Sequence, residues 1–198
     1  MRNLHIRAIW LVSALVAGVF AMNASGSEAK AQDSASSCDV LEEIVGELFD
    51  ADLSVVTFRP SEASGNKVCA ASWEIPGIDT AEETRRAVTK GLRYNNEVTL
   101  TIMGRRFDTA EEAVADLERD VATLTKGITT TIAGRERTIK REFGDWIEGV
   151  GDKAIPTGNA VMVAANGIRF TTSASTTDDE AENQANGIEL AKRIVEGL

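Results

Sequence analysis

The stretch "AVMVAANGIRFTTSAS" (160–175) decides the fold class of this chain. Two runs rich in strand-forming residues, 160–165 and 168–175, flank the dipeptide Asn166-Gly167. An Asn-Gly pair between two such runs is typical of a two-residue hairpin turn. We therefore predict two adjacent antiparallel strands in the second half of the chain.

An amphipathic helix is expected directly after this hairpin. Thr177 and Glu180 have the spacing of a capping box. Apolar residues then recur at helical spacing to the end of the chain. The buried face is predicted to contain Ala181, Ala185, Ile188, Ala191, Ile194, Val195 and Leu198.

Three more helices are expected upstream. Apolar stripes at three-four spacing predict helices over 39–50 and 109–126. A thinner stripe that begins at the capping pattern Thr80 and Glu83 predicts a short helix over 79–92. These helices alternate with the strand patterns rather than forming a separate domain.

Further strands are expected over 53–58, 67–75, 97–103, 128–132 and 137–143. The first two are separated by "RPSEASGN" (59–66), which has the composition of a loop. Tight turns between consecutive strands favour antiparallel pairing. We therefore predict an α+β fold, with a mostly antiparallel sheet packed by N-terminal, central and C-terminal helices.

The N-terminal segment has the pattern of an export signal. Two arginines precede an apolar run over 8–22, which is too short for a membrane span of about 20 residues and suits a secretory signal peptide. "AKA" (29–31) is a cleavage motif, and a cut near Ala24 or an uncleaved anchor are the alternatives. We predict a signal peptide over 1–31, a periplasmic or secreted protein, and no stable membrane insertion after cleavage.

The charge and length of the remaining chain limit its partners and its number of domains. Cleavage after residue 31 leaves 18 basic and 30 acidic residues of the original 21 and 31, a net charge of −12. Such an acidic body repels nucleic acid, so no nucleic-acid partner is expected. A flexible N-terminus over 32–37 and a single domain over 38–198 are expected from composition and length.

The cysteine and histidine content limits the chemistry. Cys38 and Cys69 are the two cysteines, and an even count in an exported chain predicts one disulfide. His5 is the sole histidine and lies in the predicted signal peptide. Histidine-dependent nucleophilic catalysis and His-ligated zinc are therefore not expected, and we predict no catalytic residues, metal or cofactor.

Three motifs resemble functional signatures but lack the context these need. "GVGDKA" (149–154) matches a dinucleotide loop, yet Pro156 follows it, so we predict a glycine turn. Ser64-Gly65-Asn66-Lys67 matches a penicillin-binding motif without its accessory motifs. The acidic run 178–182 could recruit calcium, but it also suits the first turn of a helix.

Basic residues form two runs on this acidic chain. They are Arg105 and Arg106, and then Arg135, Arg137, Lys140 and Arg141. One interpretation is that charge protects exposed strand edges from pairing. The other is a partner-binding face, for which Phe143 would supply an aromatic anchor, while Trp146 is expected in the core.

Several segments of the chain resemble a group of small exported domains of unknown function that are common as actinobacterial cell-envelope lipoproteins. The segments are "CDVLEEIVG" (38–46), "VCAASWE" (68–74), "GVGDKA" (149–154), "VMVAANGIRFTTSAS" (161–175) and "ANGIELAKRIVEGL" (185–198). The resemblance implies a PsbP/Mog1-like sandwich of sheet and helices with a disulfide. It also implies a binding or assembly role, although this chain lacks the cysteine that carries lipid.

The expected function is that of a non-enzymatic exported module that binds or assembles cell-envelope components. The partner is expected to be an envelope protein or another acidic molecule, contacted by Arg105, Arg106, Arg137, Lys140, Arg141 and Phe143. A hydrolase that uses carboxylates and a small-ligand carrier are the alternatives. A pair of carboxyls with burial-shifted pKa values in a cleft would favour the hydrolase, and a closed apolar cavity would favour the carrier.

Overall fold

The computed structural model describes residues 37–198 except positions 76, 79, 91–92 and 133. All described residues belong to one compact unit. The predicted signal peptide and the segment 32–36 lie outside the described residues, whereas Ser37 is the first residue of a helix.

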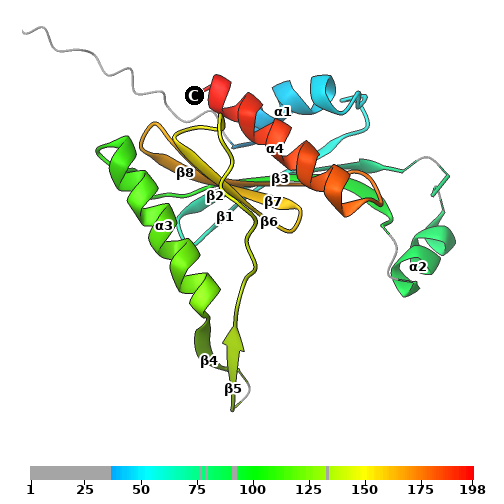
Figure 1. Ribbon diagram of the computed structural model, residues 1–198. Coiled ribbons are helices and arrows are strands. Elements are labelled where there is room, and N and C mark those ends of the chain that lie inside the picture. Colours follow the sequence, from blue (N-terminus) through cyan, green and yellow to red (C-terminus); the bar gives the residue numbers. More distant parts are fainter. Residues whose placement is uncertain (1–36, 76, 79, 91–92, 133) are drawn as a thin grey trace, which may run out of the picture. The chain divides into compact units, whose positions relative to one another are not determined.

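The main sheet has six strands, all antiparallel to their neighbours (Figure 1). In spatial order they are β1 (Thr57–Ala63), β2 (Asn66–Glu74), β3 (Asn95–Ile102), β8 (Ile168–Ser175), β7 (Ala160–Ala165) and β6 (Lys153–Thr157). A separate two-stranded sheet pairs β4 (Ile128–Ile132) with β5 (Arg135–Ile139). The helices are α1 (Ser37–Leu48), α2 (Ala81–Thr89), α3 (Ala110–Lys126) and α4 (Glu180–Glu196). The predicted α+β class is confirmed.

Helices cover both faces of the main sheet. α1 and α4 pack on one face and α3 on the other (Figure 1). The alternation of strand side chains divides the core accordingly, because Val161 and Val163 of β7 face α1 and α4, whereas Met162 and Ala164 face α3. A strand that is apolar on both faces therefore lies in the middle layer of the fold.

The β7–β8 hairpin has the predicted boundaries and turn. Asn166 and Gly167 both have positive φ angles, 50° and 73°, as the tight turn requires. A methyl group at Gly167 would lie 2.7 Å from the carbonyl oxygen of Phe107. This turn therefore depends on glycine for its backbone angle and for its packing.

The predicted disulfide is confirmed. Cys38 in the first turn of α1 is bonded to Cys69 in β2, with a Cα–Cα distance of 5.1 Å. Cys69 is fully buried, next to Leu41 and Val45 of α1 in the core. The bond thus fixes α1 on the sheet.

The first strand was predicted in the wrong place. The β-rich residues 53–56 lie outside β1, where the Val55 amide donates to the Asp52 carbonyl at 3.0 Å. β1 instead occupies most of the expected loop, and Ser64 and Gly65 form the turn to β2. Pro60 argued against a strand, yet it is tolerated because β1 is an edge strand.

The start and buried face of α4 also differ from expectation. Asp179, and not Thr177, is the N-cap, and its carboxylate accepts from the Glu182 amide at 3.0 Å. Ala181 and Ala185 are exposed. Asn183, Gly187 and Leu190 occupy the buried face, with Ala191 and Ile194 as predicted. An apolar pattern could not indicate a buried asparagine and glycine.

The region after β5 is not a strand. β5 ends at Ile139, and the following segment runs along β6, where the Gly144 amide donates to the Pro156 carbonyl at 3.0 Å. Phe143 packs beneath α3 as a result, so the predicted strand over 137–143, which would have placed Phe143 on the same side as Arg137, is wrong beyond Ile139. Trp146 is 41% exposed, which corrects its expected burial.

Candidate functional site

The predicted basic residues do not form one surface. Arg105 and Arg106 lie in the loop before α3, and Arg105 contacts Asp116 in the first half of that helix. The second group follows the C-terminal end of α3, where the Arg141 amide donates to the Leu124 carbonyl. α3 therefore separates the two groups, and each must be considered by itself.

Arg105 takes part in a charge cluster around Asp116. Its guanidinium lies 3.4 Å from the Asp116 carboxylate and 4.6 Å from the centre of the Phe107 ring. Asp116 also pairs with Arg119 on the same helix and with Arg169 of β8. Sequence analysis missed this cluster, although an arginine within an apolar strand was a signal for it.

Arg169 is the buried member of the cluster. Its side chain is 3% exposed, and it also contacts Asp120 at 2.7 Å. Burial raises the pKa of Asp116, but hydrogen bonds and charge from Arg169 and Arg119 outweigh this effect and hold the pKa below its usual range. Asp116 therefore stays ionised, and its ion pair with Arg169 links α3 to β8. A general acid would instead need a carboxyl that is protonated near neutral pH.

"GVGDKA" forms the expected glycine turn. Gly149 and Gly151 have φ angles of 75° and 58°, and the chain then enters β6, not a helix. The Asp152 carboxylate accepts from the Asn166 amide at 2.8 Å. The motif thus fixes the β7–β8 turn and has no helix N-terminus to meet a phosphate.

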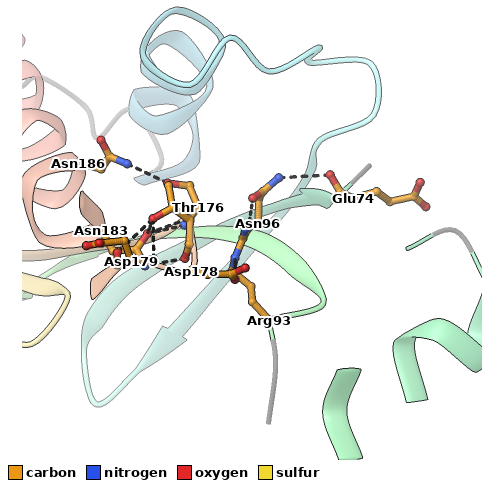
Figure 2. Close-up of polar contacts among 9 residues, drawn as sticks. Glu74, Arg93, Asn96, Thr176, Asp178, Asp179, Asn183 and Asn186 are labelled. Atoms are coloured by element: carbon orange, nitrogen blue, oxygen red, sulfur yellow. Dashed lines mark hydrogen bonds and ion pairs between the residues drawn. The ribbon is translucent and has the colours of Figure 1, made fainter. Parts of the chain in front are cut away.

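A polar cluster joins the end of the sheet to the start of α4 (Figure 2). The Asn183 side chain accepts from the Thr176 and Thr177 amides at 2.8 and 2.9 Å and donates to the Thr177 carbonyl. This buried asparagine thereby satisfies the backbone where β8 turns into the helix. The cluster explains why a polar residue occupies the buried face of α4.

The acidic run before α4 has structural roles as well. Asp178 pairs with Arg93 at 3.2 Å, and Arg93 also donates to Asn96, whose amide reaches the Glu74 carbonyl (Figure 2). Asp179 caps the helix. Within the described part of the chain, no three acidic, histidine or cysteine side chains are grouped as a metal site requires.

Two grooves run along α1. One has a volume of about 580 Å³ and the other about 250 Å³, and Glu43 and Glu47 line both. Both grooves are open to solvent and bordered by acidic side chains. Neither has the closed apolar form that would favour a ligand carrier.

The remaining surface of interest is the segment 126–141, which we call the β4–β5 arm. It contains the β4–β5 hairpin and extends beyond the C-terminal end of α3 (Figure 1). The Gly127 amide donates to the Thr123 carbonyl and the Arg141 amide to the Leu124 carbonyl, at 3.0 and 3.1 Å. These bonds attach the base of the arm to the last turn of α3.

The β4–β5 arm exposes every side chain that the structure describes between 128 and 139. Ile128 and Ile139 are cross-strand partners and are 44% and 48% exposed. Thr130 and Arg137 are also cross-strand partners. They lie on the same face of the hairpin as Ile128 and Ile139, because alternate residues of a strand share a side. The hairpin therefore presents adjacent apolar and cationic side chains to solvent.

Charge distinguishes the β4–β5 arm from the rest of the molecule. Its residues include five basic side chains and one acidic side chain, on a chain with a formal net charge of −10. The five are Lys126, Arg135, Arg137, Lys140 and Arg141. Three of the predicted binding residues, Arg137, Lys140 and Arg141, thus share this one element, and Phe143 does not belong to it.

Comparison with known proteins returns no matching family model, no matching curated protein and no matching solved structure. Among the helices of the described residues, none has the length and apolar character to cross a membrane.

Proposed function

We propose that this protein is a non-enzymatic exported module that binds or assembles cell-envelope components, and that its β4–β5 arm contacts an acidic partner. The observation that carries the proposal is the exposed cationic hairpin on an acidic chain. A two-stranded hairpin that covers no core contributes little to the stability of the fold. Arginine is enriched among the residues that dominate binding at protein interfaces, and in this hairpin it lies beside exposed isoleucines.

Export is supported by two independent features. The Cys38–Cys69 disulfide is compatible with an oxidising compartment such as the periplasm or the extracellular space. The N-terminal sequence has the composition of a signal peptide. We also propose that the chain is related to the exported envelope domains that its sequence resembles and shares their PsbP/Mog1-like arrangement.

The proposal is tested by charge reversal on the β4–β5 arm. Arg137→Glu together with Arg141→Glu should reduce capture of envelope proteins by the immobilised protein at least fivefold, because opposite charges steer association. Quantitative mass spectrometry of cross-linked partners measures this loss. Capture by the native protein should also weaken as salt is raised from 50 to 300 mM.

A matched control makes the same change of charge elsewhere. Arg85 in the middle of α2 and Lys90 at its C-cap are exposed, and their joint substitution by Glu alters the net charge equally. Capture should be retained in this control. Equal loss in both double variants, or no loss in the arm variant, contradicts the proposal.

A further inference from the structure

The edges of the main sheet are protected against pairing with another strand. The segment 142–147 covers β6, through the Gly144–Pro156 hydrogen bond, a Thr157 hydroxyl that donates to the Glu142 carbonyl, and a bridge between Ile147 and Ala154. The other edge strand, β1, contains Pro60. Prolines and covering segments are the usual means of blocking a sheet edge.

In the part of the chain that the structure describes, the hairpin of the β4–β5 arm has neither form of protection. No proline occurs between 126 and 141, and both strands of a two-stranded sheet have an outer edge. The register pairs Ile132 with Arg135 across a two-residue turn. Such turns are closed by a hydrogen-bonded pair, and bonded and non-bonded pairs then alternate along an antiparallel ladder.

This alternation determines which backbone groups face outward. The pairs that include Arg135, Arg137 and Ile139 bond within the hairpin. The amides and carbonyls of Glu136 and Thr138 are consequently directed away from β4. On the opposite edge, the same holds for Thr129 and Thr131 of β4.

Charge distinguishes the two free edges. β4 has the sequence "ITTTI" and no charged residue, whereas β5 has the sequence "RERTI". Arg135 and Arg137 lie on one face of β5, together with Ile139, and Glu136 lies on the other face. An incoming strand beside β5 thus meets two positive charges and an isoleucine on one face, and a negative charge on the other.

We propose that the β5 edge binds an extended acidic peptide segment of the partner by strand addition. The segment carries carboxylates at two alternate positions, opposite Arg135 and Arg137, and a β-branched apolar residue opposite Ile139. Cross-strand neighbours of opposite charge stabilise a sheet, and like charges opposite one another destabilise it. Because Glu136 repels a carboxylate on the other face, alternating acids are preferred to adjacent ones.

This inference rests on the proposed function and specifies how the β4–β5 arm recognises its partner. Main-chain hydrogen bonds supply affinity in strand addition, and alternate side chains supply specificity. The arginines also prevent a second copy of the arm from pairing along β5, because its own Arg135 and Arg137 would be brought close.

The test uses labelled nonapeptides with the full-length exported protein. The probe is Thr-Val-Thr-Glu-Thr-Glu-Thr-Val-Thr, whose symmetry allows parallel and antiparallel pairing. The comparison peptide has the same composition with adjacent glutamates, Thr-Val-Thr-Thr-Glu-Glu-Thr-Val-Thr. Fluorescence anisotropy should show several-fold tighter binding of the alternating peptide.

Proline variants distinguish strand addition from simple charge attraction. Thr138→Pro removes an outward amide from β5 and should weaken binding roughly tenfold. Thr131→Pro makes the same change on the β4 edge and should leave binding unchanged. Thr138→Val keeps the amide and should bind as the native protein does. At saturation, the amides of Glu136 and Thr138 should exchange hydrogen more slowly, and those of Thr129 and Thr131 should not.

The outcomes separate this inference from the proposed function. If Thr138→Pro binds as well as Thr131→Pro, or if Glu136 and Thr138 gain no protection, strand addition is wrong. Loss of binding in Arg135→Glu with Arg137→Glu would then still support an acidic partner held by side chains alone. If neither peptide binds, the inference is overturned, and the capture experiment with envelope proteins decides the proposed function.

Discussion

The two hairpins of this chain have similar turns and very different surroundings. β7–β8 and β4–β5 each have two residues between their strands, and the second is a glycine with φ of 73° or 75°. β7 is buried on both faces, whereas the described side chains of β4 and β5 are exposed. Local turn chemistry therefore specifies a hairpin in both places. Whether the hairpin is buried depends on the residues of its two strands.

The composition of the strands explains why one hairpin is buried and the other is exposed. "AVMVAA" places apolar side chains on both faces, so helices can pack above and below it. "ITTTI" and "RERTI" consist mainly of threonine and charged residues, with isoleucine only at the strand ends, and their described side chains are exposed. A two-stranded hairpin without such cover is only marginally stable by itself, so contact with a partner would stabilise it, as the proposed binding role requires.

Removing the C-terminal part of α4, which packs on the buried β7–β8 hairpin, should have the largest effect on stability. Deletion of residues 188–198 removes Leu190, Ala191 and Ile194, which are at most 1% exposed. The loss of about 5 kcal/mol or more is comparable with the whole stability of a domain, so the product should aggregate or be digested. Thermal unfolding and limited proteolysis measure this. A melting temperature within a few degrees of the full chain would contradict the described packing.

Matched glycine substitutions in the two turns should differ clearly. Gly167→Ala combines a positive φ with a methyl group 2.7 Å from the Phe107 carbonyl oxygen, and should cost about 2–3 kcal/mol. Gly134→Ala has the same angular strain, but no described atom lies within 4 Å of its methyl group. Because local opening of this exposed hairpin relieves the strain, the free energy of unfolding should fall by about 0.5 kcal/mol or less. Urea unfolding of both variants gives the comparison, and equal costs would show that packing at Gly167 is unimportant.

The pairing of Asp116 with Arg169 should make the attachment of α3 depend on pH. The pKa of Asp116 is lowered from its usual value of about 3.8, so its ionised form stabilises the fold above that value. This contribution is lost as the pH falls through the lowered pKa. Asp116→Asn should therefore destabilise the protein by about 1–3 kcal/mol at pH 7, and less at pH 3.

Urea titrations at the two pH values measure this difference. Glu118→Gln is a suitable control, because Glu118 lies on the same helix and pairs with Lys153 at the surface. Its cost should be small. An Asp116→Asn penalty that is the same at pH 3 and pH 7 would mean that the charge of Asp116 is unimportant.

Replacement of the exposed hairpin should have the smallest effect on stability. Residues 128–139 can be exchanged for a short Gly/Ser turn between Gly127 and Lys140. Because the segment covers no core, the free energy of unfolding should change by about 0.5 kcal/mol or less. Urea unfolding tests this expectation, and a loss of several kcal/mol would show that the β4–β5 arm is part of the core structure.

Much of the fold could be predicted because its signals are local. The β7–β8 turn, the helix over 109–126 and the capping box of Thr80 and Glu83 depend on residues a few positions apart, and all three are present. β1 and β6 were misplaced or missed, since each contains a proline that is tolerated only at a sheet edge. Edge position is a property of the assembled sheet.

The candidate site was less predictable for the same reason. Arg137, Lys140 and Arg141 were identified by charge, and their place on an exposed element is confirmed. The pattern alone could not reveal that Arg105 contacts Asp116. It also could not place Phe143 under α3, because that contact depends on where the chain leaves the hairpin.

The placement of α1 and α4 on one face of the sheet has a consequence for the order of folding. Leu41 near the start of the described chain and Leu190 near its end belong to the same core cluster. A ribosome must therefore have synthesised nearly the whole chain before this side of the core can close. Contacts between such distant residues slow folding, which leaves the new chain unfolded for longer. If the chain is exported as proposed, this delayed closure would keep it unfolded during passage through a translocation channel.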